Sequence, residues 1–179
     1  MGLKSTATRY GSVAIAIHWV SALAIVALLI SGTVMAGVVG EAKRSILPIH
    51  ATIGSLVLLL TLLRIGWWVW GDRRPQPVPN QPRLQEVAAR IVHGLLYAGI
   101  IVLGASGIAT LALSGAVPAL LSGAPLPDFS GLLPRLTHGI VGKAMIVLLA
   151  VHVAAALYHQ FIRRDHLLGR MGIGPAGQA

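Results

Sequence analysis

The sequence predicts an all-α membrane protein, a four-transmembrane-helix bundle with both termini in the cytoplasm. Of its 179 residues, 55% are hydrophobic, and the mean hydropathy is +0.79. A helix needs roughly 20 mostly apolar residues to cross a bilayer. Four stretches meet this requirement, and each is apolar nearly all round, as expected where lipid surrounds a helix. We expect a single domain over residues 1–179, with spans at about 13–39, 50–70, 87–113 and 138–162.

The basic residues predict the orientation of the spans. The net charge of +9 would favour nucleic-acid binding in a soluble protein, but here the basic residues lie between long apolar runs. We therefore expect no nucleic-acid partner and interpret the charges by the positive-inside rule, which places the more basic side in the cytoplasm. One side carries Lys4, Arg9, Arg64, Arg73, Arg74, Arg83, Arg90, Arg163, Arg164 and Arg170. The other side carries only Lys43, Arg44, Arg135 and Lys143.

The absence of cysteine excludes several kinds of redox centre and metal site. Disulfides, iron–sulfur clusters, thiolate zinc sites and covalently attached c-type haem all require cysteine, and the chain has none. Any redox centre must therefore be held by other side chains.

Histidine is the residue type that stands out in the spans. Ionisable groups inside a bilayer are costly and usually mark function. A single intramembrane histidine would more often be a packing residue, but six of the seven lie inside or at the ends of the four spans. These six are His18, His50, His93, His138, His152 and His159, and the seventh, His166, follows the last span.

The last span indicates two sites at different depths. His138 and His152 are 14 residues apart. In an α-helix this spacing corresponds to a rise of about 21 Å and a rotation of only about 40° around the axis. Both side chains therefore lie on one helix face, which is the arrangement that two cofactors stacked across a membrane need.

The residue types favour haem over a bare metal ion. Sites for zinc, manganese or nickel usually add carboxylates or cysteines to histidine. The acidic residues nearest the spans, Glu86 and Asp165, lie at or beyond their ends. Two neutral imidazoles in an apolar slot suit a six-coordinate haem iron, and filling both axial positions favours electron transfer over oxygen chemistry.

Depth in the membrane predicts how the histidines pair. His50 and His138, each at the outer end of a span, form the predicted outer pair. For the inner haem we choose His18 with His152, while His93 and His159 remain candidates for that pair. As unpaired residues, His93 and His159 would line a pocket for a quinone head group, where a protonatable hydrogen-bonding side chain is useful.

Haem propionates are anionic and require cations nearby. Lys143 is the preferred candidate on the outer side, because it lies about one turn inside its span, and Arg64 is a candidate on the inner side. Anchoring to lipid headgroups is the alternative interpretation of both residues. Further candidates are Arg135 and Arg44 on the outer side, and Arg9 and Arg90 on the inner side.

Taken together, these patterns resemble the bacterial cytochrome b561 family of four-helix, dihaem membrane cytochromes. The matching motifs occur in the family's order over nearly the whole chain. They are Ala16-Ile17-His18-Trp19, His50-x3-Gly54-x9-Arg64, His93-x3-Tyr97 and His138…His152-x6-His159, the last continuing into Gln160-Phe161-x3-Asp165.

The resemblance implies two haem b groups and a place in the bacterial inner membrane. It implies an enzyme that oxidises superoxide on the periplasmic side and passes the electrons to ubiquinone. Basic residues on the outer side, Lys143 among them, would attract the superoxide anion. A periplasmic protein donor is a further possibility. The alternative function is that of the cytochrome b electron-transfer subunit of a membrane-bound hydrogenase or dehydrogenase.

Overall fold

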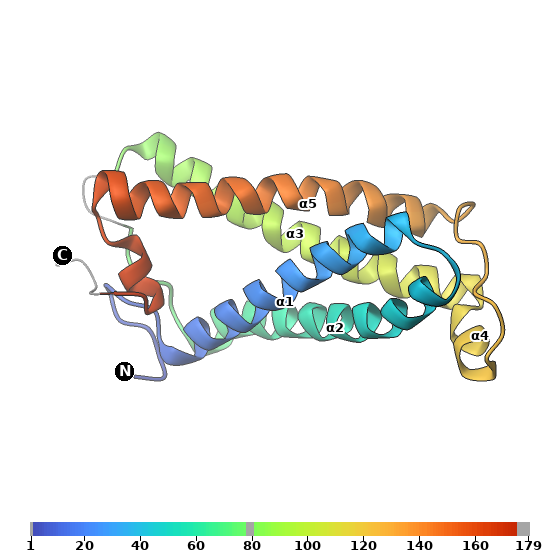
Figure 1. The fold of residues 1–179 in the computed structure, drawn as a ribbon. Coiled ribbons are helices and arrows are strands. Elements are labelled where there is room, and N and C mark those ends of the chain that lie inside the picture. Colours follow the sequence, from blue (N-terminus) through green and yellow to red (C-terminus); the bar gives the residue numbers. More distant parts are fainter. Residues whose placement is uncertain (1, 78–80, 175–179) are drawn as a thin grey trace. The chain divides into compact units, whose positions relative to one another are not determined.

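The structure, a computed structural model, describes residues 2–77 and 81–174. All regular secondary structure in this part of the chain is helical (Figure 1). Four helices are long and apolar enough to cross a membrane, which confirms the predicted all-α fold with four spans. They are α1 (Ser12–Gly37), α2 (Gly40–Gly66), α3 (Arg83–Ser114) and α5 (Leu133–Leu157). The cytoplasmic location of both termini stays a prediction. The shorter elements are α4 (Ala116–Ser122), the π-helical turns η1 (Trp67–Gly71) and η2 (Tyr158–Arg163), and the 3-10 turn η3 (Leu167–Met171).

The second, third and fourth observed spans extend beyond the apolar stretches that predicted them, whereas α1 ends at Gly37, before the predicted end at residue 39. The largest difference is at α2, which begins ten residues before the predicted span and includes Pro48. Its first turns contain Glu41, Lys43 and Arg44, which an apolarity criterion leaves out. Helical hydrogen bonding satisfies the backbone of this polar stretch as well as that of the apolar one, so the helix does not end where apolarity ends.

The chain forms two compact units, and each long helix contributes one part to each unit. Unit 1 comprises Met1–Val20, Leu62–Leu96 and Val147–Ala179, and unit 2 comprises Ser21–Thr61 and Tyr97–Ile146. The predicted single domain over residues 1–179 stays a prediction.

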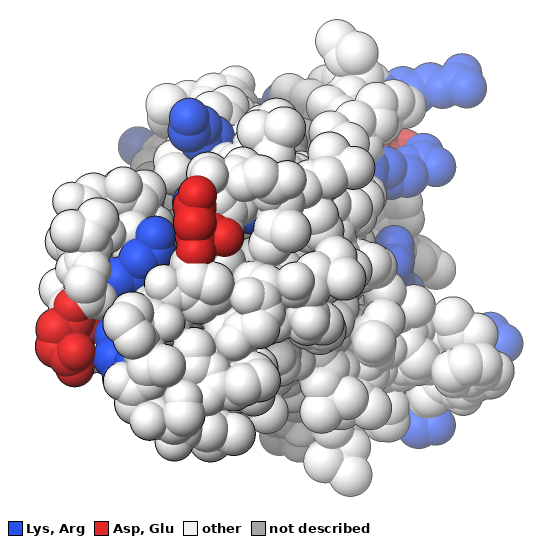
Figure 2. Space-filling model, turned by 90° about the vertical axis from the view of Figure 1, so that its right-hand side faces the viewer, with Lys and Arg blue, Asp and Glu red and all other residues white. Residues whose placement is uncertain are grey.

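The surface of the helices is apolar. Leu23, Leu63 and Ile140 are each at least half exposed, and the few fully buried side chains include Met145. Figure 2 shows that most of the visible surface consists of residues that carry no charge. Contiguous exposed apolar surface of this kind requires an apolar partner, and lipid supplies it.

Glycines on α3 allow close helix packing in unit 2. A Cβ atom added to Gly104 would lie 2.8 Å from Cδ2 of Leu58 on α2. A Cβ atom added to Gly99 would lie 2.5 Å from Cε of the buried Met145 on α5. Small residues at these two positions therefore bring α2 and α5 against α3, as is common where membrane helices associate without a hydrophobic driving force.

Hydrogen bonds tie the N-terminal and C-terminal segments together in unit 1. The Trp19 indole Nε1 donates to the Met171 carbonyl at 2.9 Å, and the Tyr10 amide donates to the Arg170 carbonyl at 3.2 Å. The loop after η1 joins them through Asp72, whose carboxylate accepts from the Ser5 hydroxyl at 2.7 Å. Burial acts to raise the pKa of Asp72, but the hydrogen bonds from Ser5 outweigh it and lower that pKa below its usual value.

The glycine packing leads to a stability prediction. Replacing Gly104 by alanine introduces a methyl group within 3.0 Å of three Leu58 atoms. Overpacking of this kind costs about 1–3 kcal/mol, which exceeds the gain of about 1 kcal/mol from helix propensity. We expect Gly104→Ala to lower the thermal unfolding midpoint of the detergent-solubilised protein. The matched control is Gly94→Ala on the same helix, where an added Cβ meets no atom within 4 Å. A lower midpoint for the control than for Gly104→Ala would contradict the packing argument.

Candidate functional site

Unit 2 brings His50 on α2 and His138 on α5 together. Their ring centroids are 6.1 Å apart, and the ring planes are inclined by 66°. Two imidazoles on opposite sides of one metal ion, each bound at about 2 Å, have centroids roughly 6 Å apart. The observed separation therefore fits one shared metal between the two rings.

A Ser-Gly dipeptide on a neighbouring helix holds each of these rings. Ser31 Oγ lies 2.8 Å from Nδ1 of His50, and a Cβ added to Gly32 would lie 3.4 Å from Cε1 of that ring. Ser106 Oγ lies 3.2 Å from Nδ1 of His138, and a Cβ added to Gly107 would lie 3.3 Å from its Cε1. In both cases the serine binds the ring, and the glycine leaves room for it.

These contacts decide which ring nitrogen is available to a metal. The carbonyl oxygen of Leu103 can only accept a hydrogen bond, so Nδ1 of His138, 3.0 Å away, carries the proton. The Ser31 hydroxyl donates to the Leu28 carbonyl at 3.2 Å, which leaves its oxygen to accept from Nδ1 of His50. Nε2 of both rings then has a free electron pair, which is the state of a metal-binding histidine whose other nitrogen is hydrogen-bonded.

Unit 1 contains a second pair of rings with nearly the same separation. The centroids of His18 on α1 and His152 on α5 are 6.4 Å apart, with ring planes inclined by 63°. This separation fits one shared metal as well as the first pair does. The Trp19 ring packs edge-on against His18 at 5.2 Å.

His93 on α3 is the competing residue in unit 1. Its ring centroid is 5.2 Å from that of His152, closer than two trans ligands of one metal would lie. Its Nδ1 donates to the Ala89 carbonyl at 2.6 Å, so Nε2 is free, but the residue is exposed. Separation and burial favour His18 as the partner of His152, whereas the hydrogen bond at Nδ1 of His93 leaves Nε2 of His93 free to bind a metal.

Arg64 on α2 contacts the ring of His18. A guanidinium nitrogen, Nη1, lies 3.2 Å from Nδ1 of His18. Because guanidinium can only donate, Nδ1 accepts and Nε2 carries the proton in this arrangement. Metal binding at Nε2 would move the proton to Nδ1 and require Arg64 to turn to another acceptor. An anionic group of the cofactor would be such an acceptor.

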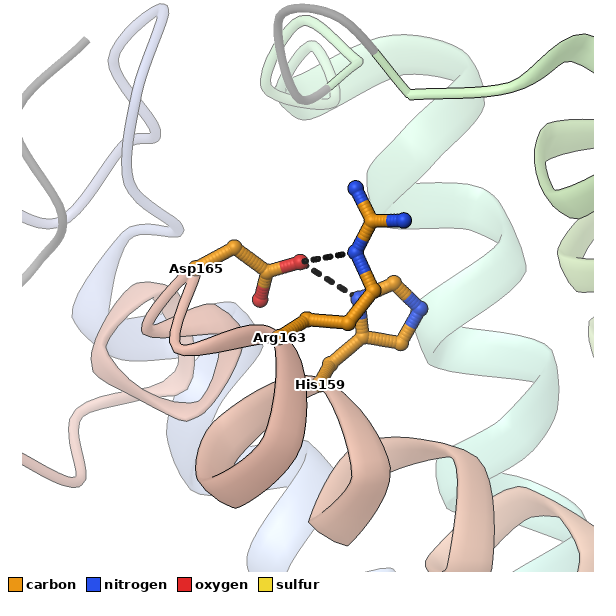
Figure 3. A network of polar contacts seen from close by, with 3 residues as sticks. All are labelled: His159, Arg163 and Asp165. Carbon is orange, nitrogen blue, oxygen red and sulfur yellow. Dashed lines mark hydrogen bonds and ion pairs between the residues drawn. The ribbon is translucent and has the colours of Figure 1, made fainter.

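His159 on η2 lies apart from the ring pairs and has an acidic partner. Its Nδ1 lies 2.5 Å from Oδ2 of Asp165, and Nε of Arg163 lies 3.9 Å from the same oxygen (Figure 3). His159 and Asp165 are both mostly buried. Tyr158 packs edge-on against the His159 ring, with centroids 5.8 Å apart.

Lys143 occupies a different position from the other predicted site residues. It lies on α5 in unit 2, and its side chain is exposed. Five residues of α-helix separate it from His138, which corresponds to about 140° around the axis. Lys143 therefore contributes a surface charge on another face of α5.

Sequence reasoning missed the two serines. The chain contains five Ser-Gly dipeptides, and only those at Ser31 and Ser106 lie within the interior of a long helix. That position is the signal that could have identified them. Within residues 2–77 and 81–174, no group of three or more His, Cys, Asp or Glu side chains converges to hold a bare metal ion.

Comparisons with known proteins agree with the sequence patterns. The family profile described as Prokaryotic cytochrome b561 matches residues 9–174. Cytochrome b561 homolog 2 of Escherichia coli K12 is 30% identical, with 96% of this chain and 95% of that protein aligned. Cytochrome b562 of Cereibacter sphaeroides is 29% identical over 90% of this chain and 94% of its own length. Cytochrome b561 homolog 1 of Escherichia coli K12 is 26% identical over 91% and 96%. No solved structure matches the chain.

The serine contacts lead to a prediction about cofactor affinity. Removing a hydrogen-bond partner of a ligating histidine typically lowers metal affinity about 10- to 100-fold. We expect Ser31→Ala to weaken haem binding by this amount, measured by haem titration of the apoprotein. Ser55→Ala is the matched control, since the Ser55 hydroxyl donates to the Ala51 carbonyl within α2. Equal affinities of the two variants would contradict a role for Ser31 in holding His50.

Proposed function

Because the chain belongs to the prokaryotic cytochrome b561 family, we propose that it holds two haem b groups, one in each unit, and passes electrons between them to a quinone. As a member of this family it is a b-type cytochrome that transfers electrons in a bacterial membrane. The observation that carries the proposal is the recurrence of one geometry. Each unit holds a pair of histidine rings from two helices, with centroids 6.1 Å and 6.4 Å apart.

In unit 2 a haem would be held by His50 and His138, and in unit 1 by His18 and His152. A haem iron accepts and releases one electron, and bis-imidazole ligation leaves it no open position for oxygen. The free Nε2 atoms of His50 and His138 support the unit 2 assignment. Ring separation supports His18 over His93 in unit 1.

Arg64 is the proposed partner of an anionic haem propionate in unit 1. Its guanidinium already lies beside the His18 ring, at 3.2 Å from Nδ1. Ligation through Nε2 of His18 would displace this hydrogen bond, and a carboxylate would offer Arg64 a stronger, charge-assisted one. Arg64 would thus contribute both to binding the haem propionate and to orienting His18.

Charge supports an orientation with unit 1 towards the cytoplasm of the inner membrane. The ten basic residues predicted for the inner side all fall in unit 1, and the four predicted for the outer side all fall in unit 2. By the positive-inside rule, the four basic residues of the second set would face the periplasm.

Superoxide is the proposed electron donor at the outer face, and ubiquinone the acceptor at the inner face. Two superoxide ions would give two molecules of oxygen and two electrons, which with two protons convert one quinone to quinol. Lys143, with its exposed ammonium group, would attract the anion. Arg44 has fewer donors left to contact the anion directly, because its guanidinium donates to the carbonyls of Ala119, Leu120 and Ala124.

His159 is the proposed hydrogen-bonding residue for the quinone head group. It lies near the end of the last span, on the π-helical turn η2, and it is outside both ring pairs. Helix segments of this kind recur at functional sites. A protonatable ring at this level suits an acceptor that takes up protons together with electrons.

The ligand assignment predicts which haem each substitution removes. We expect His138→Ala to lose the unit 2 haem and His152→Ala to lose the unit 1 haem, since an iron with one axial imidazole is held poorly. Haem quantitation per chain and reduced-minus-oxidised spectra measure both losses. His93→Ala is the control and should retain two haems. Retention of two haems by His152→Ala would contradict the unit 1 assignment in favour of His93 or His159.

The donor assignment predicts rapid reduction of the haems by superoxide. Mixing the purified oxidised protein with superoxide in a stopped-flow instrument should reduce the haems, and Lys143→Glu should slow this several-fold at low ionic strength, where charge steering is strongest. Lys4→Glu, in unit 1, is the charge-matched control. No reduction of the wild-type haems would exclude superoxide as donor. Copurification of an iron–sulfur subunit would then favour the electron-transfer subunit of a hydrogenase or dehydrogenase.

A further inference from the structure

The turn that follows the last span places a carboxylate directly against His159. Oδ2 of Asp165 accepts from Nδ1 of His159 at 2.5 Å, and the Asp165 amide donates to the His159 carbonyl at 3.3 Å. Side chain and backbone therefore both join these two residues, which are six positions apart. The side chains are 12% and 16% exposed, so water competes little for the contact.

The backbone around Asp165 adopts an unfavourable conformation to make this contact. Arg164 and His166, on either side of it, have φ angles of 55° and 53°. The left-handed region is uncommon for residues other than glycine, and such strain clusters at functional sites. A helix end usually places glycine at such a position. Two non-glycine residues in this conformation turn the chain back so that the carboxylate reaches the ring.

The contacts of Asp165 indicate which ring nitrogen of His159 carries a proton. Nε of Arg163 lies 3.9 Å from Oδ2, so a cation supports the ionised carboxylate. An ionised carboxylate only accepts, which assigns a proton to Nδ1 of His159. The other ring nitrogen, Nε2, lies on the side of the ring away from Asp165 (Figure 3). It is the nitrogen left to exchange a proton with a substrate.

We propose that Asp165 is a positioning residue for quinone reduction, which holds His159 with Nε2 directed at the substrate and stabilises the ring when it is positively charged. This role rests on the proposed function, in which a quinone accepts the electrons. The protonated ring breaks its Nε2–H bond and gives the proton to a quinone oxygen, where an O–H bond forms. The ring becomes neutral and keeps its Nδ1 proton on Asp165. The ring then takes up a proton from water at Nε2 and gives it to the second quinone oxygen. Two such protons, with two electrons that the haems would supply, give the quinol.

An ordinary structural contact at a helix end is the competing explanation for the pair. A structural contact would affect folding and haem retention without acting specifically through His159. A positioning role would affect quinone reduction and would disappear when His159 is absent. The two explanations therefore differ in what a double substitution does.

The first experiment measures quinol formation by the haem-loaded protein with a soluble ubiquinone analogue and a chemical reductant. We expect Asp165→Asn to keep both haems and to lower kcat about 10- to 100-fold, as loss of an orienting partner does, with little change in KM. Asp165→Glu, which keeps the charge, should restore part of the rate. Asp72→Asn removes a carboxylate elsewhere in unit 1 and should leave the rate unchanged.

The double substitution decides between the two explanations. In a His159→Gln background, Asp165→Asn should cause no further loss of rate. A full additional loss in that background, or an unchanged rate for Asp165→Asn alone, would overturn the proposal.

A second experiment tests the pair without relying on quinone. Nitrogen-15 NMR of histidine-labelled protein should show His159 with its proton on Nδ1, and Asp165→Asn should shift this signal. A His159 ring protonated only on Nε2 would overturn the proposal. An intact Nδ1–H signal in a protein that reduces no quinone would contradict the proposed function and overturn the proton-donor role of His159, while the pairing itself would stand.

Discussion

A hydrogen bond at Nδ1 orients the rings of His50, His138 and His159, and the candidate sites depend on this orientation. A histidine on an apolar helix offers two nitrogens, and only a partner for one of them fixes which is free and where the ring points. His50 and His138 find such partners in serine hydroxyls, and His159 finds one in a carboxylate. In surroundings without water, no solvent molecule competes for these bonds, so they hold the rings before any cofactor arrives.

The two units hold their rings by different means. In unit 2 the ring partners are neutral: the Ser31 hydroxyl at His50, and the Ser106 hydroxyl with the Leu103 carbonyl at His138. Each serine belongs to the long helix that precedes its histidine in the chain. In unit 1 a cation, Arg64, lies against His18. The His18 ring is therefore contacted by a charged donor, whereas the rings of unit 2 are contacted by neutral groups.

The sequence was sufficient for much of the architecture. The number of long helices follows from hydropathy alone, because a bilayer sets the length of any helix that crosses it. The start of α2 could not be predicted in this way, since the polar residues around Lys43 continue the helix without continuing the apolar run. From the sequence, Asp165 could be identified only as part of a motif. Its contact with His159 depends on two residues in the left-handed backbone conformation, which propensity rules do not predict.

The structural features that the sequence determined by itself are those within a single helix. The spacing of His138 and His152 puts both on one face of α5, and the helical repeat guarantees this without further information. Only the tertiary structure decided which ring from another helix faces each of them. It brought His50 to His138, brought both His18 and His93 to His152, and assigned a serine to each ring in unit 2. These contacts join residues on different helices, and they depend on how small residues such as Gly104 and Gly107 let the helices pack.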